Sequence, residues 1–201
     1  MSDTLMDIQD AKIYFPVREG SFIKKTVAHV KAVDGISLTI KTGDTLGLVG
    51  ESGSGKTTLL NGITMLEPLT GGKAVYRDTD LSTLPAKERK KVRRHVQIVF
   101  QDPFWSLNPR WLVRDVVGEP LKAHGITPRG DAYQDAVAEA LEMVGLKGDD
   151  LYKYPHEFSG GLRQRIAIAR ALVLKPDLIA LDEPTSAIDV VSQHQILLML
   201  Q

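Results

Sequence analysis

The 201-residue sequence contains no cysteine and no long apolar run. The lack of cysteine excludes a disulfide scaffold, a thiolate zinc site and a cysteine nucleophile, and it fits a reducing compartment. No apolar run approaches the roughly 18 residues that a membrane-spanning helix needs. The opening MSDTLMDIQD lacks the basic and apolar regions of a signal peptide. We therefore expect a soluble protein that is not exported.

Excess charge of either sign is also missing. The 25 basic residues balance the 25 acidic ones, so no global field attracts the chain to nucleic acid or to an anionic membrane. Any such partner would have to be met through a local patch. The basic run at residues 87–94 is one candidate, but it has no aromatic residues on which bases could stack. It therefore predicts a solvated helix face.

The sequence does contain strand and helix patterns in an order typical of an α/β protein. Residues 6–15 and 30–40 carry short β-branched and apolar stretches, which predict an antiparallel hairpin with a long loop. Residues 45–49 predict a short buried strand, and residues 50–55 a glycine-rich loop. A helix is predicted over residues 56–66, where apolar positions recur at helical spacing. This order places the loop at the start of the helix.

The second half of the sequence predicts helices inserted between two core strands. The strands are expected at residues 96–100 and 178–181, and helices run through residues 112–146. An apolar stripe that predicts core packing consists of Ala136, Val137, Ala140, Leu141 and Val144. We expect a single domain over residues 1–201, with the helical insertion at about residues 102–160.

A phosphate-binding loop is the strongest motif. Gly50-Glu51-Ser52-Gly53-Ser54-Gly55-Lys56-Thr57, followed by Thr58, fits the pattern G-x-x-x-x-G-K-[ST] between a predicted strand and a predicted helix. Its glycines let successive backbone N–H groups face one anion, and the helix N-terminus adds positive potential. Lys56 would reach the outer phosphates, and Thr57 would offer an oxygen to Mg²⁺. The dinucleotide pattern G-x-G-x-x-G does not fit this loop, which argues against a nicotinamide site.

A pair of carboxylates follows the apolar strand predicted at residues 178–181. Alone, Asp182 and Glu183 would be a weak signal, because acidic residues often end strands. In a chain that also has a phosphate loop, the pair is interpreted as a Walker B site. Asp182 would bind Mg²⁺, and Glu183 would orient the attacking water as a general base.

A third motif comes before the helix predicted after residue 161. Alone, Ser159 could be only an N-cap followed by two flexible glycines. Together with the two motifs above, however, the segment FSGGLRQR at residues 158–165 resembles the signature sequence of ATP-binding-cassette ATPases. The same resemblance is carried by GESGSGKTT at 50–58, VFQDP at 99–103, LIALDEPTSAID at 178–189 and the pair Tyr14-Phe15. It covers nearly the whole chain.

A finer resemblance points to one branch of the family. FPVREG, SLNPR at residues 106–110 and YPHEFSGG at residues 154–161 are similar to the branch that takes up peptides and nickel. This match rests on shorter and less specific segments than the match to the ATPase family.

The resemblance implies the P-loop NTPase fold, a three-layer α/β core with an N-terminal antiparallel β subdomain and an inserted helical subdomain. It implies that Gln101 is the Q-loop glutamine that contacts Mg²⁺ and the transmembrane partner, and that residues 186–189 form the D-loop. One of Tyr14 and Phe15 would stack on adenine, and Phe15 is favoured.

The resemblance also implies partners. Two such domains would pair head to tail, as a homodimer or a heterodimer. Ser159, Gly160 and Gly161 of one domain would then contact the γ-phosphate of the ATP held by the other, because a helix start offers N–H donors to an anion. The pair would act beneath transmembrane permease subunits at the cytoplasmic face of the membrane. No nucleic-acid partner is expected.

Two departures from the family pattern stand out. The signature position that is most often glutamine is Leu162, which we expect to weaken closure of the dimer without abolishing it. The family's switch histidine ends a further strand, and the sequence stops at Gln201 before such a strand, so it looks truncated. His194 falls in a segment that looks helical and is no substitute. A missing terminal strand would expose a sheet edge, so we expect lowered stability and self-association.

Three hypotheses remain at this level. The first is an ATP-binding and ATP-hydrolysing subunit of a membrane importer, with oligopeptides or dipeptides as cargo. The second is a soluble cassette ATPase that acts on nucleic acid or ribosomes, with only the basic run in its favour. The third is a truncated module that binds ATP with little turnover.

Overall fold

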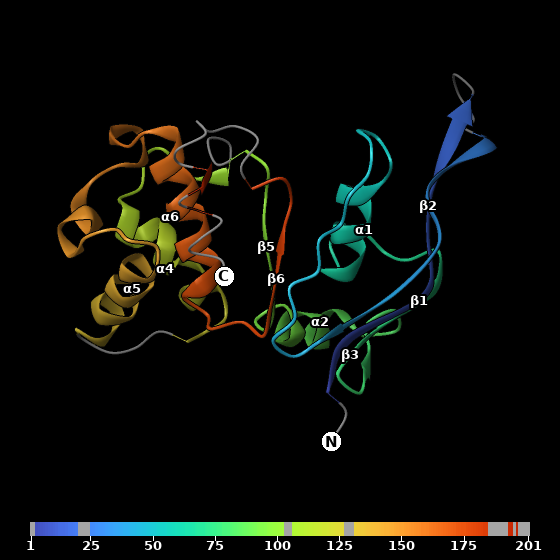
Figure 1. Ribbon diagram of the computed structural model, residues 1–201, viewed down its shortest axis with the longest axis horizontal. Coiled ribbons are helices and arrows are strands. Elements are labelled where there is room, and N and C mark those ends of the chain that lie inside the picture. The colour runs from blue at the N-terminus through green and yellow to red at the C-terminus, as the bar shows by residue number, and fades with distance from the viewer. Residues whose placement is uncertain are drawn as a thin grey trace. The chain divides into compact units, whose positions relative to one another are not determined.

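The computed structural model describes residues 3–19, 25–102, 106–126 and 131–184, together with residues 193, 194 and 196. The chain divides into two compact units, Met1–Arg93 and Arg94–Gln201. The phosphate loop belongs to the first unit, and the carboxylate pair belongs to the second (Figure 1).

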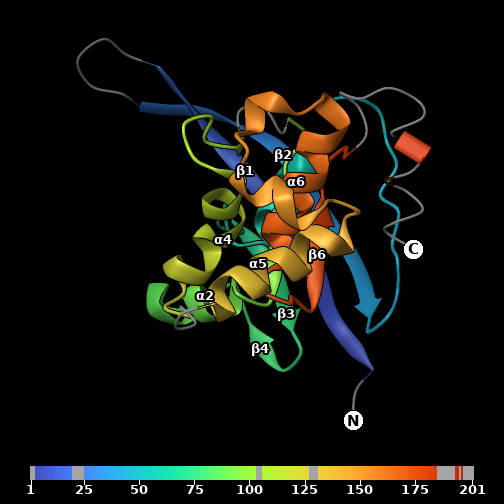
Figure 2. The ribbon, with the colours of Figure 1, turned by 90° about the vertical axis from the view of Figure 1, so that its left-hand side faces the viewer.

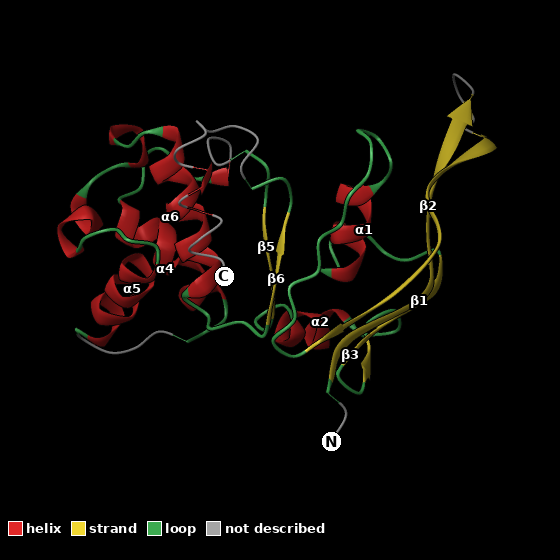
Figure 3. Ribbon diagram, in the orientation of Figure 1, coloured by secondary structure: helices red, strands yellow, loops and turns green. Residues whose placement is uncertain are grey.

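The first unit is built on a four-stranded antiparallel sheet in the order β2-β1-β3-β4. Strand β1 spans Thr4–Glu19, β2 spans Lys25–Lys41, β3 spans Gly71–Tyr76 and β4 spans Thr79–Asp80 (Figure 3). β1 and β2 pair along their lengths, from Thr4 opposite Lys41 to Glu19 opposite Lys25. This ladder confirms the predicted hairpin, and its apolar face supplies the core of the unit.

Helix α1 spans Lys56–Ile63 and packs on the hairpin. Leu59 and Ile63 are buried, and a Cβ at Gly62 would lie 2.7 Å from Cδ1 of Ile13, so helix and strand approach closely there. The helix ends three residues before the predicted end. The hydroxyl of Thr64 donates to the carbonyl of Leu60 at 2.8 Å, and Met65 adopts a positive φ, so the helical path stops.

The strand predicted at residues 45–49 does not form. Residues 44–50 have no regular secondary structure, and neither sheet includes them (Figure 3). Leu46 is 52% exposed and Val49 is 96% exposed. A strand exists only where a neighbouring strand pairs with its backbone, and this segment follows the turn after β2 without such a neighbour. The residues of this segment are apolar, as the sequence shows, but the prediction that they form a buried strand is wrong.

The basic run forms a short helix, as predicted. Helix α2 spans Ala86–Val92 and has no buried residue. Within it, Nζ of Lys91 donates to Glu88 at 2.9 Å, an exposed pair at helical spacing. Lys87, Lys90, Lys91 and Arg94 are exposed, whereas Arg89 and Arg93 are partly buried and donate to the carbonyls of Leu84 and Met65. The predicted solvated face is therefore only part of the run.

The second unit combines a small parallel sheet with a group of helices. Strands β5, Val96–Val99, and β6, Leu178–Leu181, pair in parallel and confirm the two predicted core strands. The helices are α4, Val113–Ala123; α5, Ala132–Met143; and α6, Gly160–Leu172 (Figure 2). Two 3₁₀ turns, η1 at Gly148–Tyr152 and η2 at Pro155–Glu157, precede α6.

One hydrophobic cluster holds these helices together. Of the predicted stripe on α5 and its end, Val137, Ala140, Leu141 and Val144 are all buried in this cluster. Helix α6 adds its central residues, and α4 adds Val113 and Val117. The stripe is therefore core, as its spacing predicts, and it fixes α6 and the turn that precedes it.

Candidate functional site

The phosphate loop leads directly into helix α1. Gly55 occupies the N-cap with a φ of 93°, and no side chain caps the helix. A Cβ at Gly55 would lie 2.1 Å from the carbonyl oxygen of Ala32 in β2, so only glycine fits there. The first turn has no acidic side chain. The helix start therefore keeps its positive end open to an anion.

Lys56 fixes the shape of the loop from inside. Its Nζ donates to the carbonyl oxygens of Gly50 and Glu51, at 2.8 Å each. The backbone N–H of Ser54 also donates to the carbonyl of Glu51, at 3.2 Å. These bonds curl the loop around an ammonium group at the start of a helix. Such an arrangement is suited to a polyphosphate, because a cation and helix-end donors lie together.

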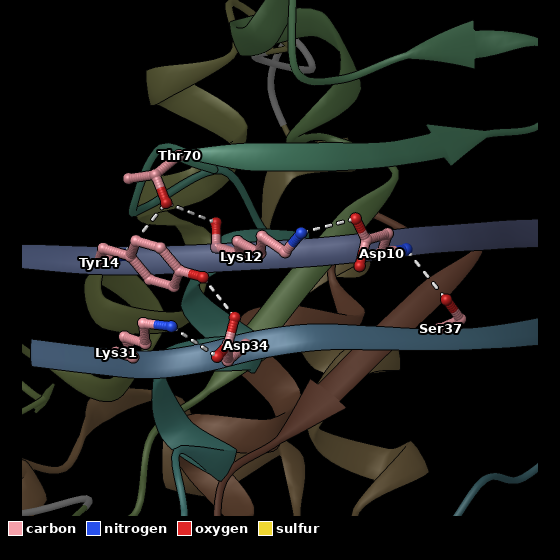
Figure 4. A network of polar contacts seen from close by, with 7 residues as sticks. All are labelled: Asp10, Lys12, Tyr14, Lys31, Asp34, Ser37 and Thr70. Carbon is pink, nitrogen blue, oxygen red and sulfur yellow. Dashed lines mark hydrogen bonds and ion pairs between the residues drawn. The ribbon is translucent and has the colours of Figure 1, made fainter.

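Tyr14 and Phe15 differ sharply in their surroundings. The hydroxyl of Tyr14 donates to Oδ1 of Asp34, and Nζ of Lys31 donates to Oδ2 of Asp34 at 3.2 Å (Figure 4). The Tyr14 hydroxyl, and then Lys31, lower the pKa of Asp34 below its usual range. Lys31 also lies 5.4 Å from the centre of the Tyr14 ring. Tyr14 is thus held by a polar network on the outer face of the hairpin.

Phe15 faces the other way. Successive side chains of a strand point to opposite faces, so Phe15 shares the face of Ile13, on which α1 packs. Phe15 is 38% exposed. Between the two aromatic residues, the geometry favours Phe15 as a platform for a base, because its face is the one next to the helix that follows the loop.

Asp182 and Glu183 directly follow strand β6. The N–H of Asp182 donates to the carbonyl of Val99 at 3.0 Å, which continues the parallel ladder by one residue. Asp182 is buried, and Glu183 adopts a positive φ of 43°, an uncommon conformation for glutamate. The turn separates the two carboxylates. Asp182 is buried at the strand end, and Glu183 is exposed.

Gln101 lies two residues beyond strand β5 and reaches the second carboxylate. Its Nε2 donates to Oε2 of Glu183 at 2.8 Å. The parallel pairing of β5 and β6 explains the contact, because it brings both strand ends to the same edge. A cavity of about 420 Å³ opens at this edge, and it is lined by Phe100, Gln101, Asp102, Ser106, Arg170 and Asp182.

The signature motif, Ser159-Gly160-Gly161, forms the start of helix α6. Ser159 takes the N-cap position, but its hydroxyl makes no capping bond. Ser159 and Gly160 are exposed, and Gly161 is buried. Arg163 fastens the preceding turn by donating from Nε to the carbonyls of Pro155 and Phe158, at 3.0 and 2.9 Å. The hydrogen bonds of Arg163 thus attach the exposed, uncapped start of α6 to the turn η2 that precedes it.

Leu162, the unusual residue of this segment, packs partly against the hydrophobic cluster of the second unit. The expected weakening of dimer closure by Leu162 stays a prediction. The loop expected at residues 186–189 and Pro103 lie outside the described residues.

The proposed magnesium ligands have the right chemistry. Thr57, Gln101 and Asp182 offer a hydroxyl, an amide oxygen and a carboxylate, and Mg²⁺ prefers oxygen ligands of this kind. Within the described residues, no cluster of three or more histidine, cysteine or acidic side chains forms a metal centre on its own. Thr57 belongs to the first unit, whereas Gln101 and Asp182 belong to the second, so their joint binding of Mg²⁺ stays a prediction.

Sequence reasoning did not identify three residues that contact the predicted site residues or line the cavity beside them. In the first unit, Asp34 and Lys31 hold Tyr14 through contacts between paired strands. In the second unit, Arg170 lines the cavity from a helix that begins far along the chain. None of the three belongs to a recognised motif, and only the three-dimensional structure shows their contacts.

Comparison with known proteins identifies the family. The model of the ABC transporter family matches residues 33–186, which include the phosphate loop, Gln101, the signature motif and both carboxylates. The chain belongs to the ABC transporter family.

Two similar relatives with curated descriptions are oligopeptide transport ATP-binding proteins. The oligopeptide transport ATP-binding protein AppF of Bacillus subtilis is 46% identical over 200 residues, which cover 99% of this chain and 60% of AppF. The oligopeptide transport ATP-binding protein OppF of Lactococcus lactis is 43% identical, over 96% of this chain and 60% of OppF. This ABC chain thus spans less than two thirds of the length of these relatives.

Solved ABC structures share the fold. A dimeric bacterial ABC transporter cassette, MJ0796, aligns with a TM-score of 0.82 and 29% identity, covering 97% of this chain and 81% of that one. The same cassette in a post-hydrolysis dimer bound to ADP and Pi gives a TM-score of 0.81 and 30% identity, with the same coverage. The predicted P-loop NTPase α/β fold is confirmed. Among the described residues, no helix is both long and apolar enough to span a membrane.

Proposed function

We propose that this ABC chain binds and hydrolyses ATP to energise a membrane importer of oligopeptides or dipeptides. The observation that carries the proposal is the contact between Gln101 and Glu183 at the end of the β5 and β6 pair, beside buried Asp182. A glutamine held on a glutamate at a strand end is suited to ordering water for hydrolysis. The peptide cargo is supported by the relatives AppF and OppF, which are oligopeptide transport ATP-binding proteins.

Each residue has a defined role in this proposal. Lys56 and the N–H groups of residues 50–58 bind the phosphates, and Phe15 stacks on the base. Glu183 accepts a proton from the attacking water, and Gln101 orients the carboxylate of Glu183 by donating to it. Thr57, Gln101 and Asp182 would hold Mg²⁺, which neutralises phosphate charge when it is bound.

We further propose that the working unit is a dimer of such chains at the cytoplasmic face of a membrane, docked on permease subunits. Support for the dimer comes from the two solved structures of the MJ0796 cassette, both of which are dimeric. Ser159 and Gly160 are exposed at an uncapped helix start, so they are available to a phosphate carried by a partner. ATP would then join the two chains, and hydrolysis would release them.

The deciding experiment is steady-state phosphate release by the purified chain at saturating Mg-ATP, with Lys56→Ala as the control for contaminating ATPases. We expect turnover that disappears in the Lys56→Ala variant. If ATP binds but phosphate release does not exceed that of the variant, the chain is an ATP-binding module without turnover, and the hydrolytic part of the proposal is wrong.

A further inference from the structure

The end of helix α1 that lies opposite the phosphate loop has an uncommon backbone conformation. The N–H of Met65 donates to the carbonyl of Gly62 at 3.0 Å, and the N–H of Leu66 donates to that of Asn61 at 2.8 Å. This pattern is the Schellman motif, in which glycine usually takes the position that Met65 occupies. Met65 is buried and has a φ of 61°. Such a conformation is disfavoured for a residue with a Cβ, and it persists where surrounding contacts impose it.

Arg93 makes one of these surrounding contacts. It directly follows helix α2, and its partly buried side chain donates from Nη2 to the carbonyl oxygen of Met65 at 2.5 Å. A charged donor makes a stronger hydrogen bond than a neutral one. A cation at the C-terminal end of a helix also interacts favourably with the helix dipole. Arg93 therefore stabilises both the end of α1 and the left-handed conformation of Met65.

The apolar contacts of α1 leave such a bond work to do. The buried side chains of Leu59 and Ile63 hold the helix on the hairpin, but apolar contacts are non-directional. The close approaches at Gly55 and Gly62 limit how near the helix can come to the strands, and they do not prevent it from moving away. The hydrogen bond from Arg93 is directional, so it sets where the end of the helix lies.

Helix α1 connects this end to the phosphate loop without a break. The helix runs from Lys56 to Ile63, and the N–H of Leu59 donates to the carbonyl of Gly55 at 2.9 Å, so helical hydrogen bonding begins within the loop itself. A displacement of the far end of such a short, regular helix therefore moves Gly55 and Lys56 as well.

We propose that Arg93 is a positioning residue for the phosphate loop. By holding the C-terminal end of α1, it places Lys56 and the N–H groups of the helix start for a polyphosphate. The inference rests on the proposed function, since it assumes that the loop binds the phosphates of ATP. It also gives the basic run at residues 87–94 a part in nucleotide binding, because one of its cations acts on the loop through a helix.

The first test compares ligand affinities of Arg93→Met and the unchanged chain. Arg93→Met removes the charge and the donors but keeps an apolar stem. We expect the dissociation constants for ATP and for inorganic triphosphate both to rise about 3- to 10-fold, which is less than the full contribution of one hydrogen bond from a charged donor. The KM for ATP should rise with them, whereas kcat at saturating ATP should stay within about twofold, since Gln101 and Glu183 are unchanged. Unchanged affinity for triphosphate would overturn the proposal.

Arg89 offers a matched control on helix α2. It is also partly buried and also donates to a backbone carbonyl, from Nε to that of Leu84 at 2.8 Å, but this partner belongs to the segment just before α2. Arg89 and Met65 line the same small cavity, so the two arginines share their surroundings. Arg89→Met should leave both dissociation constants within about twofold. Equal losses in the two variants would overturn the proposal, because they would show a general effect of disturbing α2.

Hydrogen exchange of backbone amides tests the anchor without any ligand. In Arg93→Met, the amides of Met65 and Leu66 should exchange faster, and so should that of Leu59, which bonds to Gly55 in the loop. In Arg89→Met these three amides should keep the rates of the unchanged chain, compared where every variant is folded. Faster exchange at Met65 and Leu66 without a change at Leu59 would overturn the proposal, because the helix end would be loosened with no effect on the loop.

If Arg93→Met does not fold, Arg93→Lys and Arg89→Lys replace the pair. Lysine keeps the charge but lacks the planar guanidinium, so Arg93→Lys should still raise both dissociation constants, and Arg89→Lys should not. An equal effect of the two substitutions, or no effect of either, would overturn the proposal.

The outcome is separate from that of the proposed function. If the unchanged chain binds triphosphate but releases no phosphate that depends on Lys56, the hydrolytic part of the proposed function is wrong, and the affinity test of Arg93 still stands. If the unchanged chain binds neither ligand, the proposed function fails, and the exchange of the Leu59 amide decides whether Arg93 positions the loop.

Discussion

The side chain of Gln101 donates from Nε2 to Oε2 of Glu183 at 2.8 Å, although the two residues lie 82 positions apart in sequence. The parallel pairing of β5 with β6 produces this contact by bringing two strand ends together. Glu183 takes a positive φ in the turn and is exposed, whereas Asp182 is buried. Asp182 is thus left at the strand end, where it could bind a cation. The carboxylate of Glu183 is oriented by the side-chain amide of Gln101.

Glu183→Gln should separate binding from turnover. The variant keeps the shape of the side chain but loses the carboxylate that accepts a proton, so we expect kcat to fall by about 100-fold or more. ATP affinity should stay within about twofold, since the variant keeps Lys56 and the other residues of the phosphate loop. Equilibrium binding of a fluorescent ATP analogue and phosphate release would be measured on the same preparation. Unchanged turnover would remove Glu183 from its proposed role.

Phe15→Ala should weaken ATP binding about tenfold or more, because stacking of one base on an aromatic ring contributes about 1–3 kcal/mol. Affinity for inorganic triphosphate, which has no base, should not change. Calorimetric titration with both ligands would measure the difference.

Tyr14→Phe is the matched control for that experiment. It keeps a ring but removes the hydroxyl that donates to Asp34, so it should leave ATP affinity unchanged. If Tyr14→Ala weakens ATP binding more than Phe15→Ala does, Tyr14 is the stacking residue and the assignment from strand geometry is wrong.

Local sequence patterns predict those parts of the fold that depend on nearby residues. The hairpin, helix α2, the two core strands and the buried stripe on α5 all follow from alternation, charge or helical spacing. The segment at residues 45–49 shows the limit. Its composition is that of a buried strand, but a strand also needs a partner, and that depends on contacts far along the chain.

The candidate site also has residues that the sequence predicts and residues that only the structure reveals. The phosphate loop and the carboxylate pair can be found from sequence, because their chemistry requires particular residues at fixed spacing. The choice between Tyr14 and Phe15 gains support only from the face of β1 on which each lies. Arg170 has no sequence signal, since its partner is a backbone carbonyl, and any residue at position 106 would supply one.

Substitution of two loop glycines by alanine should have unequal costs. Gly53 and Gly55 both have positive φ, at 81° and 93°, which costs a residue with a Cβ about 1–2 kcal/mol. At Gly53 no atom lies within 4 Å of the added carbon, whereas at Gly55 it would lie 2.1 Å from the carbonyl oxygen of Ala32. Gly55→Ala should therefore be the more destabilising, as measured by urea unfolding. Equal losses would show that the loop can move away from β2.

Gln164→Met should stabilise the chain. The Gln164 side chain is 1% exposed, and within the described part of the chain neither its Nε2 nor its Oε1 has a hydrogen-bond partner. Burying such groups costs about 1–3 kcal/mol, and methionine fills a similar volume without that cost. We expect the free energy of unfolding to rise by about 1–2 kcal/mol, with exposed Gln134→Met as a near-neutral control. A loss of stability would indicate that ordered water satisfies the Gln164 amide.

Asp150 should make part of the free energy of unfolding depend on pH. Burial opposes ionisation of its carboxyl, but hydrogen bonds from Lys153 Nζ at 2.7 Å and from the N–H of Lys147 at 2.9 Å outweigh it and lower the pKa of Asp150. A lowered pKa means that the unfolded chain binds the proton more tightly. The stabilising contribution is therefore present above the unfolded pKa of about 3.9 and is lost as pH falls through the lower folded value.

Asp150→Asn removes this contribution, so the variant should be less stable than the unchanged chain at pH 7, and the difference should shrink as the pH falls below about 4. Urea unfolding at a series of pH values would measure it. Asp149→Asn serves as the control, because it removes the same charge from an exposed neighbour. A difference between Asp150→Asn and the unchanged chain that stays constant down to pH 3 would show that the carboxyl stabilises η1 by its shape and not by its charge.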